Sequence, residues 1–439
     1  MKSKISKMTV DEKSKGTKSI CAQHVRRFVR YLIIGGLVFI AGLAVLGTHR
    51  QGFARTTLIP ELPRIIPDTG GPIAEVALHY LQDQNEKLYP AYRDLFMKLP
   101  NDIRILVLCQ SRKEAFYFNK VWSLSACNSG REVKIVNVDK KISPWARDRY
   151  IARQYLPSFE PADCFVPIHT NNYEAESEFY KINELGVFYH LCQKGLRPPM
   201  INSYLHLEGG NVVSNNRHVF IGSNVLSENK NNILSDDLIE QEIKRIVGSD
   251  YILIEDSNGI APYNHADMYI TPIDDQTVFI ADIVKGLSLL RKGDTQNQST
   301  SAPQFVLEGM MNKARLGKKF TRIARKLDSV ASGIEALGYR IVRLPIIIEK
   351  SDPTDWIITY NNVLMEHRGN HNVVYMPIYK IPALDQAAQA TYHDLGFEVR
   401  TVDVSELFHL GGAVRCLVNV TARKPHKIQS ITLDNKDNS

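Results

Sequence analysis

The chain has 439 residues, of which 44% are hydrophobic and 23% charged, so it can bury a large core and is neither a disordered polymer nor a small disulfide-stabilised domain. Its formal net charge is +7. The segment from Met1 to Arg55 holds eleven Lys or Arg against Asp11 and Glu12, which is +9, so the rest of the chain is −2. The body therefore lacks the basic surface typical of nucleic-acid binding, and we expect no nucleic-acid partner.

An uncharged segment of 18 residues, Tyr31–Thr48, follows the basic N-terminus. As a helix it would rise about 27 Å at ~1.5 Å per residue, which matches the hydrocarbon thickness of a bilayer. Nine Lys or Arg precede it, and such flanks stay on the cytoplasmic side. We therefore predict a cytoplasmic N-terminus (1–30), a transmembrane helix (31–48) and a membrane-anchored body on the extracytoplasmic side. If the small residues at 52–54 form a cleavage site, the segment is a signal peptide and the body is secreted. A buried core helix is the remaining alternative.

Prolines and cysteines constrain the rest of the chain. Prolines at positions 60, 63, 67 and 72 predict a short stiff stalk, or else an irregular lead-in, over residues 49–72. The six cysteines are irregularly spaced and include no Cys-x-x-Cys, so neither a disulfide scaffold nor a zinc site is expected. Five of them lie beyond the apolar segment, so at least one thiol stays unpaired within the chain if that side is oxidising.

Residues 73–424 contain five copies of one pattern: two strands, a helix and a third strand. NVVSNNRHVFIG is typical of the two-strand hairpin, and DDLIEQEIKRIV has apolar residues at helical spacing. Five such units would close a ring of mixed α/β structure. The predicted units lie at 147–207; at 211–226, 236–247 and 251–255; at 267–283, 319–337 and the strand from 339; at 361–379, 383–396 and the strand from 397; and, in a split unit, at 413–420, 86–99 and 103–109. A polar tail, 425–439, follows.

The first strands of these units start near residues 148, 211, 267, 362 and 416. The third interval is 95 residues, against 54 to 63 for the others. Its excess lies in residues 287–318, where GDTQNQSTSAPQ is polar and its flanks are basic, so we predict an inserted surface loop. The loop is either a plain solvated excursion or a lid or partner-docking element.

The strand starts carry reactive side chains instead of core hydrophobes. The strings are WARDRY (145–150), HLEGGNVV (206–213), NHADMY (264–269), TYNNVLM (359–365) and LGGAVRCLVN (410–419). Equivalent strand starts converge near the axis of a closed ring, so a thiol, an imidazole and three carboxylates are expected to meet there. Any one of them alone is ordinary, since a single Cys is usually an inert buried residue.

At these positions the sequence resembles the guanidino-group-modifying enzymes of the pentein fold, most closely agmatine deiminases and bacterial-type peptidylarginine deiminases. WARDRY is similar to the family's Trp-x-Arg-Asp, LEGGN to Glu-Gly-Gly-Asn/Asp, HADM to His-x-Asp, and GGAVRC to Gly-Gly-x-x-x-Cys, all in the family's order. The resemblance spans residues 73–424. It implies a five-bladed, pseudo-symmetric α/β propeller of ββαβ units with the active site at its centre.

The resemblance also implies roles for the matched residues. Cys416 matches the nucleophile, while Asp148 and Asp267 match the two aspartates that hold the substrate guanidinium. His265 matches the catalytic histidine. Glu208 matches a glutamate that braces this histidine and contacts the substrate.

The chemistry accounts for these residue types. Paired carboxylates can hold a planar, permanently charged guanidinium and fix its central carbon. A thiolate adds to that carbon better than water does, and the positive substrate favours the thiolate form. An imidazolium can protonate the departing ammonia, after which the imidazole activates the water that hydrolyses the covalent thiouronium. We therefore expect a deiminase, a hydrolase of C–N bonds in linear amidines. No metal or organic cofactor is expected, because the sequence has neither a Gly-rich phosphate loop after a strand nor a His-Glu-x-x-His motif.

Five further residues within these motifs are predicted to bind the substrate: Trp145, Arg147, Asn211, Asn362 and Arg415. Many agmatine deiminases have His directly before the nucleophile, where this chain has Arg415. The charge of Arg415 would lower the pKa of the thiol or grip a carboxylate or peptide carbonyl of the substrate. Agmatine, free arginine and the arginine side chain of a peptide therefore all stay open as substrates, and so does the oligomeric state.

The same residues also allow other interpretations. His265 and Asp267 alternate along a predicted strand, so they share a face and would suit metal ligands or an ion pair. Glu208 before two glycines would suit a turn, and Asp148 between two arginines would suit a salt bridge. Two other functions keep the fold: transfer of the amidino group to an amine, and guanidine binding without catalysis.

Overall fold

The computed structural model describes residues 63–425, apart from 127–129, 156–160, 166–190, 194, 196–199, 202, 231–234, 249–250, 256–258, 260–261, 263–264, 294–315 and 352–353. The predicted membrane segment, 31–48, lies outside these residues, so the anchor and the side of the membrane stay predictions from the sequence. Within the described ranges no helix is both long enough and apolar enough to cross a bilayer.

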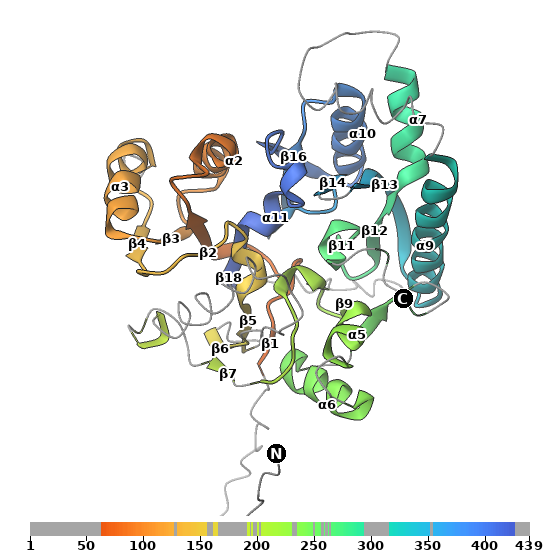
Figure 1. Cartoon of the computed structure of the whole chain (residues 1–439), viewed down its shortest axis with the longest axis horizontal. Helices are drawn as coiled ribbons and strands as arrows, with labels where there is room; N and C mark the ends of the chain where they lie inside the picture. Colours follow the sequence, from red (N-terminus) through yellow and green to blue (C-terminus); the bar gives the residue numbers. More distant parts are fainter. Residues whose placement is uncertain are drawn as a thin grey trace, which may run out of the picture. The chain divides into compact units, whose positions relative to one another are not determined.

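The described residues form five sheets arranged around a common centre (Figure 1). In each sheet the first two strands of a unit are antiparallel, and the third is parallel to the second. A hairpin can join antiparallel neighbours, whereas parallel neighbours need a longer crossover, so this pairing follows from the strand-strand-helix-strand order. The mixed α/β fold predicted from the sequence is confirmed. In strand order, the sheets are β1 (Arg64–Ile65), β5 (Ile151–Gln154), β6 (Pro161–Phe165) and β7 (Met200–Ile201); β10 (Tyr251–Ile254), β9 (Val219–Gly222) and β8 (Val212–Ser214); β11 (Ile270–Pro272), β12 (Thr277–Asp282), β13 (Arg340–Ser351) and β14 (Thr354–Thr359); β15 (Leu364–Arg368), β16 (His371–Ile378) and β17 (Phe397–Asp403); and β18 (Val418–Arg423), β2 (Ile73–Tyr80), β3 (Arg104–Cys109) and β4 (Val133–Asn137).

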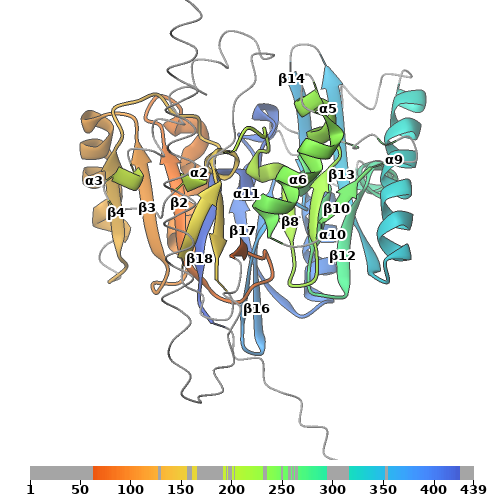
Figure 2. The ribbon, with the colours of Figure 1, turned by 90° about the horizontal axis from the view of Figure 1, so that it is seen from below.

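Longer helices cover the outer faces of the sheets, with α3 and α9 at opposite ends of the view in Figure 2. Helix α6 shows how the sequence sets such an element. The Ser235 side chain accepts a hydrogen bond from the Leu238 N–H at its start, and Gly248 ends it with a φ of +67°, which glycine adopts without strain. Its Ile239 and Ile243 are fully buried against the sheet. The helices are α2 (Asn85–Lys98), α3 (Arg112–Ala126), α5 (Asn224–Lys230), α6 (Asp236–Val247), α7 (Ile283–Gly293), α9 (Leu316–Ala336), α10 (Pro382–His393) and α11 (Val414–Leu417).

The split unit closes the ring. β18 pairs antiparallel with β2, so that Val418 lies opposite Leu78. Next to this pair, the fully buried carboxylate of Glu366 accepts a hydrogen bond from the Ile73 N–H at the start of β2 (2.9 Å). The closure therefore joins segments from the two ends of the predicted body.

Three predicted boundaries differ from the structure. Arg64–Ile65, assigned to the stalk, forms β1 and pairs with β5, because an extended dipeptide between prolines can serve as an edge strand. Helix α7 continues to Gly293 and helix α9 begins at Leu316, so residues 287–293 and 316–318 do not belong to the predicted loop. Residues 294–315 lie outside the described ranges. Gly286 permits helix α7 to pack closely on β13, since a Cβ there would lie 2.4 Å from the Ile346 carbonyl oxygen. Strands β4 and β14 extend two sheets beyond the three-stranded unit.

Candidate active site

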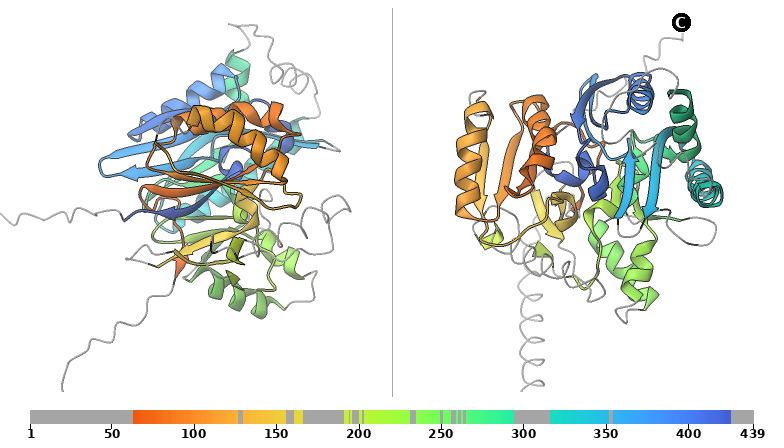
Figure 3. Two further views of the ribbon diagram at one scale, coloured as in Figure 1. Left: turned by 90° about the vertical axis from the view of Figure 1, so that its left-hand side faces the viewer. Right: turned by 45° about the horizontal axis from the view of Figure 1, so that its top comes forward.

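The predicted reactive residues lie directly before the first strand of each unit. The five first strands begin at 151, 212, 270, 364 and 418, within three residues of the predicted starts. Short helical turns hold most of these stretches and contact one another: η2 touches η3 and α11, and η3 touches η4. Figure 3 shows α11, in blue, between the sheets of the ring. Asp148 lies on η2 (Ala146–Arg149), Glu208 precedes η3 (Gly209–Asn211), His265 precedes η4 (Ala266–Met268), Asp267 lies on η4, Asn362 precedes β15, and Cys416 lies on α11.

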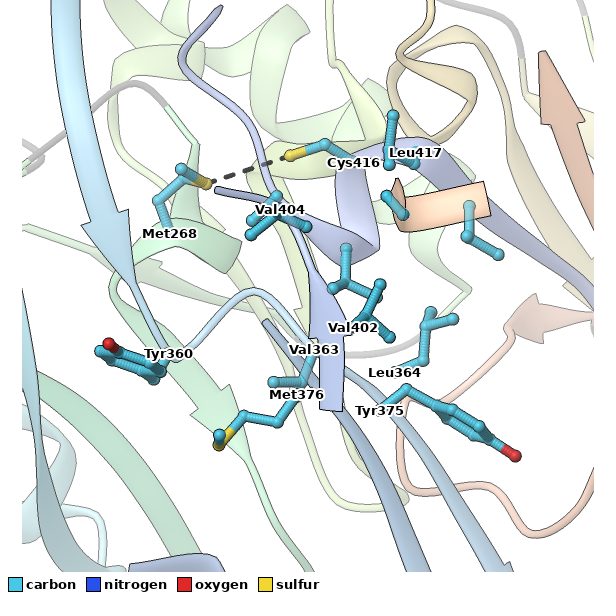
Figure 4. Packing of buried hydrophobic residues seen from close by; sticks show 14 of the residues in the cluster. Met268, Tyr360, Val363, Leu364, Tyr375, Met376, Val402, Val404, Cys416 and Leu417 are labelled. Carbon is cyan, nitrogen blue, oxygen red and sulfur yellow. Dashed lines mark hydrogen bonds between the residues drawn. The ribbon is translucent and has the colours of Figure 1, made fainter. Parts of the chain in front are cut away.

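Cys416 is buried, with 3% of its surface exposed. The side chain of Asn362 fixes both the backbone and the sulfur of Cys416. Its Oδ1 accepts hydrogen bonds from the backbone N–H groups of Arg415 (2.8 Å) and Cys416 (3.2 Å), and its Nδ2 donates to the Cys416 sulfur (3.2 Å). The thiol points toward the sulfur of Met268, 4.0 Å away, as Figure 4 shows. Burial, together with the carboxylates of Asp267 and Asp148, raises the pKa of this thiol well above its usual value.

His265 lies between two carboxylates. Its Nε2 is 2.9 Å from Glu208 Oε2, and its Nδ1 is 3.7 Å from Asp148 Oδ1. Burial opposes the positive charge on the ring, but the carboxylates of Asp148 and Glu208 outweigh it and raise the pKa of His265 to about 10. The same contact lowers the pKa of Glu208 despite its burial. At neutral pH the pair is therefore an imidazolium with a carboxylate.

Asp148 receives a second fixed contact from the Gly210 N–H, which donates to its Oδ1 (3.0 Å). Burial raises the pKa of Asp148, and the neighbouring His265 charge opposes that shift. Gly210 is packed directly against both side chains: a Cβ there would lie 2.5 Å from His265 Nδ1 and 2.7 Å from Asp148 Oδ1. Only glycine allows the chain to approach these two groups so closely.

Asp267 belongs to a buried ion network with Arg415 and Asp68. Arg415 Nη1 donates to Asp267 Oδ2 (2.7 Å), and its Nε and Nη2 donate to Asp68 (2.9 to 3.2 Å). The other oxygen of Asp267, Oδ1, is buried and has no hydrogen-bond partner among the residues that the structure describes. This oxygen can accept an N–H from a bound molecule.

The remaining predicted binding residues support the same centre. Arg147 is buried and donates to the carbonyls of Gly209 and Val212 (both 3.1 Å), so it holds the Glu-Gly-Gly-Asn segment. Asn211 donates to the Gly222 carbonyl (3.3 Å) and to another Asn side chain. The ring of half-buried Trp145 packs on Gly412, where a Cβ would come within 2.4 Å of it.

The orientation of the His-x-Asp pair differs from the strand prediction. His265 precedes the turn η4 and Asp267 lies within it, while β11 begins only at Ile270. His265 consequently contacts Glu208, whereas Asp267 contacts Arg415. Among the described side chains, no group of three or more His, Cys, Asp or Glu is arranged to hold a metal ion.

Asp68 and Met268 belong to the site although no motif indicates them. Asp68 lies in the predicted stalk, and its partner Arg415 lies 347 residues away, so no local pattern connects them. The only sequence signal is the turn-forming Pro-Asp-Thr-Gly-Gly string at 67–71. Met268 lies inside the HADM motif, but nothing in its residue type indicates a contact with the thiol.

Comparisons with known proteins agree with the fold. The family model described as Porphyromonas-type peptidyl-arginine deiminase matches residues 77–421. Among solved structures, an agmatine deiminase of C. jejuni matches with a TM-score of 0.57 and 15% identity, over 83% of this chain and 98% of that one. An agmatine deiminase of Enterococcus faecalis matches with a TM-score of 0.53 and 12% identity, over 83% and 96% of the two chains. No curated protein sequence matches the chain. The resemblance stated from the motifs is confirmed.

Proposed function

We propose that this chain, which belongs to the Porphyromonas-type peptidyl-arginine deiminase family, is a deiminase that converts a guanidino group to a ureido group and releases ammonia. The observation that carries the proposal is the unpartnered Asp267 Oδ1. A buried carboxylate oxygen without a donor is costly, and a guanidinium N–H would satisfy it with a charge-assisted hydrogen bond. Asp148 is the second carboxylate near the thiol, so a planar cation held by both would place its central carbon close to Cys416.

Substrate binding also activates the nucleophile. Without substrate, burial and the charges of Asp267 and Asp148 raise the pKa of Cys416 and keep it a thiol. A bound guanidinium offsets these negative charges, so the pKa of the thiol falls and its proton leaves to solvent. The thiolate then adds to the guanidinium carbon and forms a tetrahedral adduct.

His265 then supplies the proton for the leaving group. Its imidazolium protonates one nitrogen of the adduct, the C–N bond breaks, and ammonia leaves a covalent thiouronium on Cys416. The neutral imidazole next takes a proton from a water molecule, whose oxygen adds to the same carbon. The C–S bond breaks and the thiolate is regenerated. The hydroxyl proton of the adduct leaves to solvent, and the ureido product remains. Glu208 keeps the ring oriented through its 2.9 Å contact with Nε2.

An ammonia-release screen tests the proposal and identifies the substrate class. The full chain is incubated with agmatine, arginine, arginine-containing peptides and methylated arginines. We expect ammonia and a ureido product from at least one of them, and none from Cys416→Ala. The matched control is Cys109→Ala, because Cys109 is an equally buried thiol on β3, with a pKa raised to about 12 by burial.

Three results would contradict the proposal. Unchanged ammonia release by Cys416→Ala would exclude this nucleophile. A product that forms only when an amine such as glycine is added would show amidino transfer instead of hydrolysis. Guanidine binding without any release of ammonia would leave a binding protein with the same fold.

A further inference from the structure

Asp68 is the one member of the buried ion network that lies outside the repeated units. Two hydrogen bonds fix its backbone. The Asp68 N–H donates to the Ser214 carbonyl (2.8 Å), and the Asp68 carbonyl accepts a hydrogen bond from Arg423 Nη2 (2.7 Å). Its carboxylate accepts the Ser214 N–H (2.9 Å) in addition to Arg415. The side chain is only 17% exposed. Asp68 is thus fixed in the centre of the ring and directed at Arg415.

Arg415 shares its donors unequally between two carboxylates. Its Nε and Nη2 donate to Asp68, and only Nη1 donates to Asp267, while Nη2 also donates to the Val212 carbonyl (3.0 Å). The side chains of Arg415 and Asp267 are 5% and 1% exposed, so water screens this contact little. With Asp267 alone, Arg415 would cancel the carboxylate charge that a cationic substrate needs. With Asp68 present, these three groups together keep one negative charge. The buried Arg147 also interacts with all three, and the carboxylate of Asp148 balances its positive charge.

We propose that Asp68 is a positioning residue that neutralises Arg415 and so leaves Asp267 with the charge and the free oxygen that bind a guanidinium. This inference rests on the proposed function, because it takes the bound cation to be the guanidinium of the substrate. It also assigns Arg415 a role different from the substrate contact predicted from the sequence. Asn362 fixes the backbone of Arg415 together with that of Cys416, so the network and the thiol share one rigid support.

Charge selectivity separates this role from a merely structural one. Methylguanidinium and methylurea have nearly the same shape, but only the first is charged. Loss of local structure would weaken the binding of both ligands alike. Loss of the network's negative charge would weaken only the binding of the cation, so the ratio of the two affinities is the informative quantity.

The experiment measures both affinities by calorimetry on the full chain and on three variants. Asp68→Asn should lower the preference for methylguanidinium roughly tenfold or more, because Arg415 then faces Asp267 alone. Asp68→Asn combined with Arg415→Gln should restore much of the preference, because Asp267 again supplies one uncompensated charge. The matched control is Asp94→Asn, another buried carboxylate with a cationic neighbour, Lys98, and it should keep the wild-type ratio.

The outcomes distinguish the two proposals. If the wild-type chain releases ammonia and Asp68→Asn keeps the wild-type preference, the role of Asp68 is refuted and the deiminase function stands. If the wild-type chain prefers the cation and loses that preference in Asp68→Asn, but releases no ammonia from any guanidine, Asp68 is supported and the deiminase function fails. A wild-type chain without preference for the cation refutes the role of Asp68, and the deiminase function fails with it only if no guanidine yields ammonia. Equal weakening of the two ligands in Asp68→Asn, or a double variant no better than the single one, also refutes the role of Asp68.

Discussion

Gly210→Ala introduces a methyl group between the imidazole and a carboxylate of the site. The new Cβ would lie 2.5 Å from His265 Nδ1 and 2.7 Å from Asp148 Oδ1, whereas ordinary contacts begin at 3.4 Å. The ring must therefore move by about 0.9 Å and the carboxylate by about 0.7 Å to relieve the overlap. A misplacement of about 1 Å at a reacting group can cost about 100-fold in rate, so we expect kcat for ammonia release to fall by about that factor.

The assay for this variant measures kcat from steady-state ammonia release. Denaturant unfolding measures the fraction of the sample that is folded. Overpacking of this kind costs about 1–3 kcal/mol of unfolding free energy, which alone would not remove the activity of a folded sample. The matched control is Gly333→Ala in α9, where a Cβ meets nothing within 4 Å. That change should add about 0.5–1 kcal/mol of stability and leave kcat unchanged. A Gly210→Ala variant with wild-type kcat would refute the reasoning, and so would a loss that merely equals its unfolded fraction.

Two further predictions concern His265 and Asn362. Because the pKa of His265 is raised to about 10, above its unfolded value near 6.5, its contribution to stability is complete below pH 6.5 and is lost as the pH rises through 10. Denaturant unfolding from pH 6 to 10 should show this decline, on the order of a few kcal/mol, in the wild-type chain; an equal decline in His265→Gln would show that another group causes it. Asn362→Asp keeps the acceptor for the Arg415 and Cys416 N–H groups but replaces the donor 3.2 Å from the sulfur with a negative oxygen, which should raise the pKa of the thiol. We expect kcat at pH 7 to fall about tenfold or more and to recover partly at higher pH, and a pH–rate profile that superimposes on the wild-type profile would contradict this.

Hydrophobic periodicity predicts the fold well, because every unit shows the same two patterns: the alternation of a two-strand hairpin and the helical spacing of apolar residues. The hairpin of β8 and β9 and the helix α6 lie where the pattern predicts them, and α6 has the predicted bounds of Asp236–Val247. The repeat does not predict strands β4 and β14, because they extend two sheets beyond the repeated unit. Periodicity also gives no sign of strand β1 after Pro63, because two residues are too few to show any alternation.

The candidate site follows from the register of the repeat. Since each first strand begins within three residues of its predicted start, Asp148, Asp267 and Cys416 occupy equivalent positions at the centre. Their contacts could not be predicted in the same way. The charge of Arg415 is evident from the sequence, but its saturation by Asp68 and Asp267 depends on residues 347 and 148 positions away. Such pairings come from tertiary packing and leave no local pattern.

The pairing of β18 with β2 has a consequence for how the molecule folds. Val418 and Leu78 are neighbours in the sheet although 340 residues separate them in the chain. Contacts between residues so far apart in the sequence form slowly, because the chain loses the entropy of closing a long loop before the contact contributes any stabilising free energy. α11 directly precedes β18, so this long-range pairing also fixes the strand that follows Cys416. If the other sheets form first, the segment that carries Cys416 reaches its final place in one of the latest steps of folding.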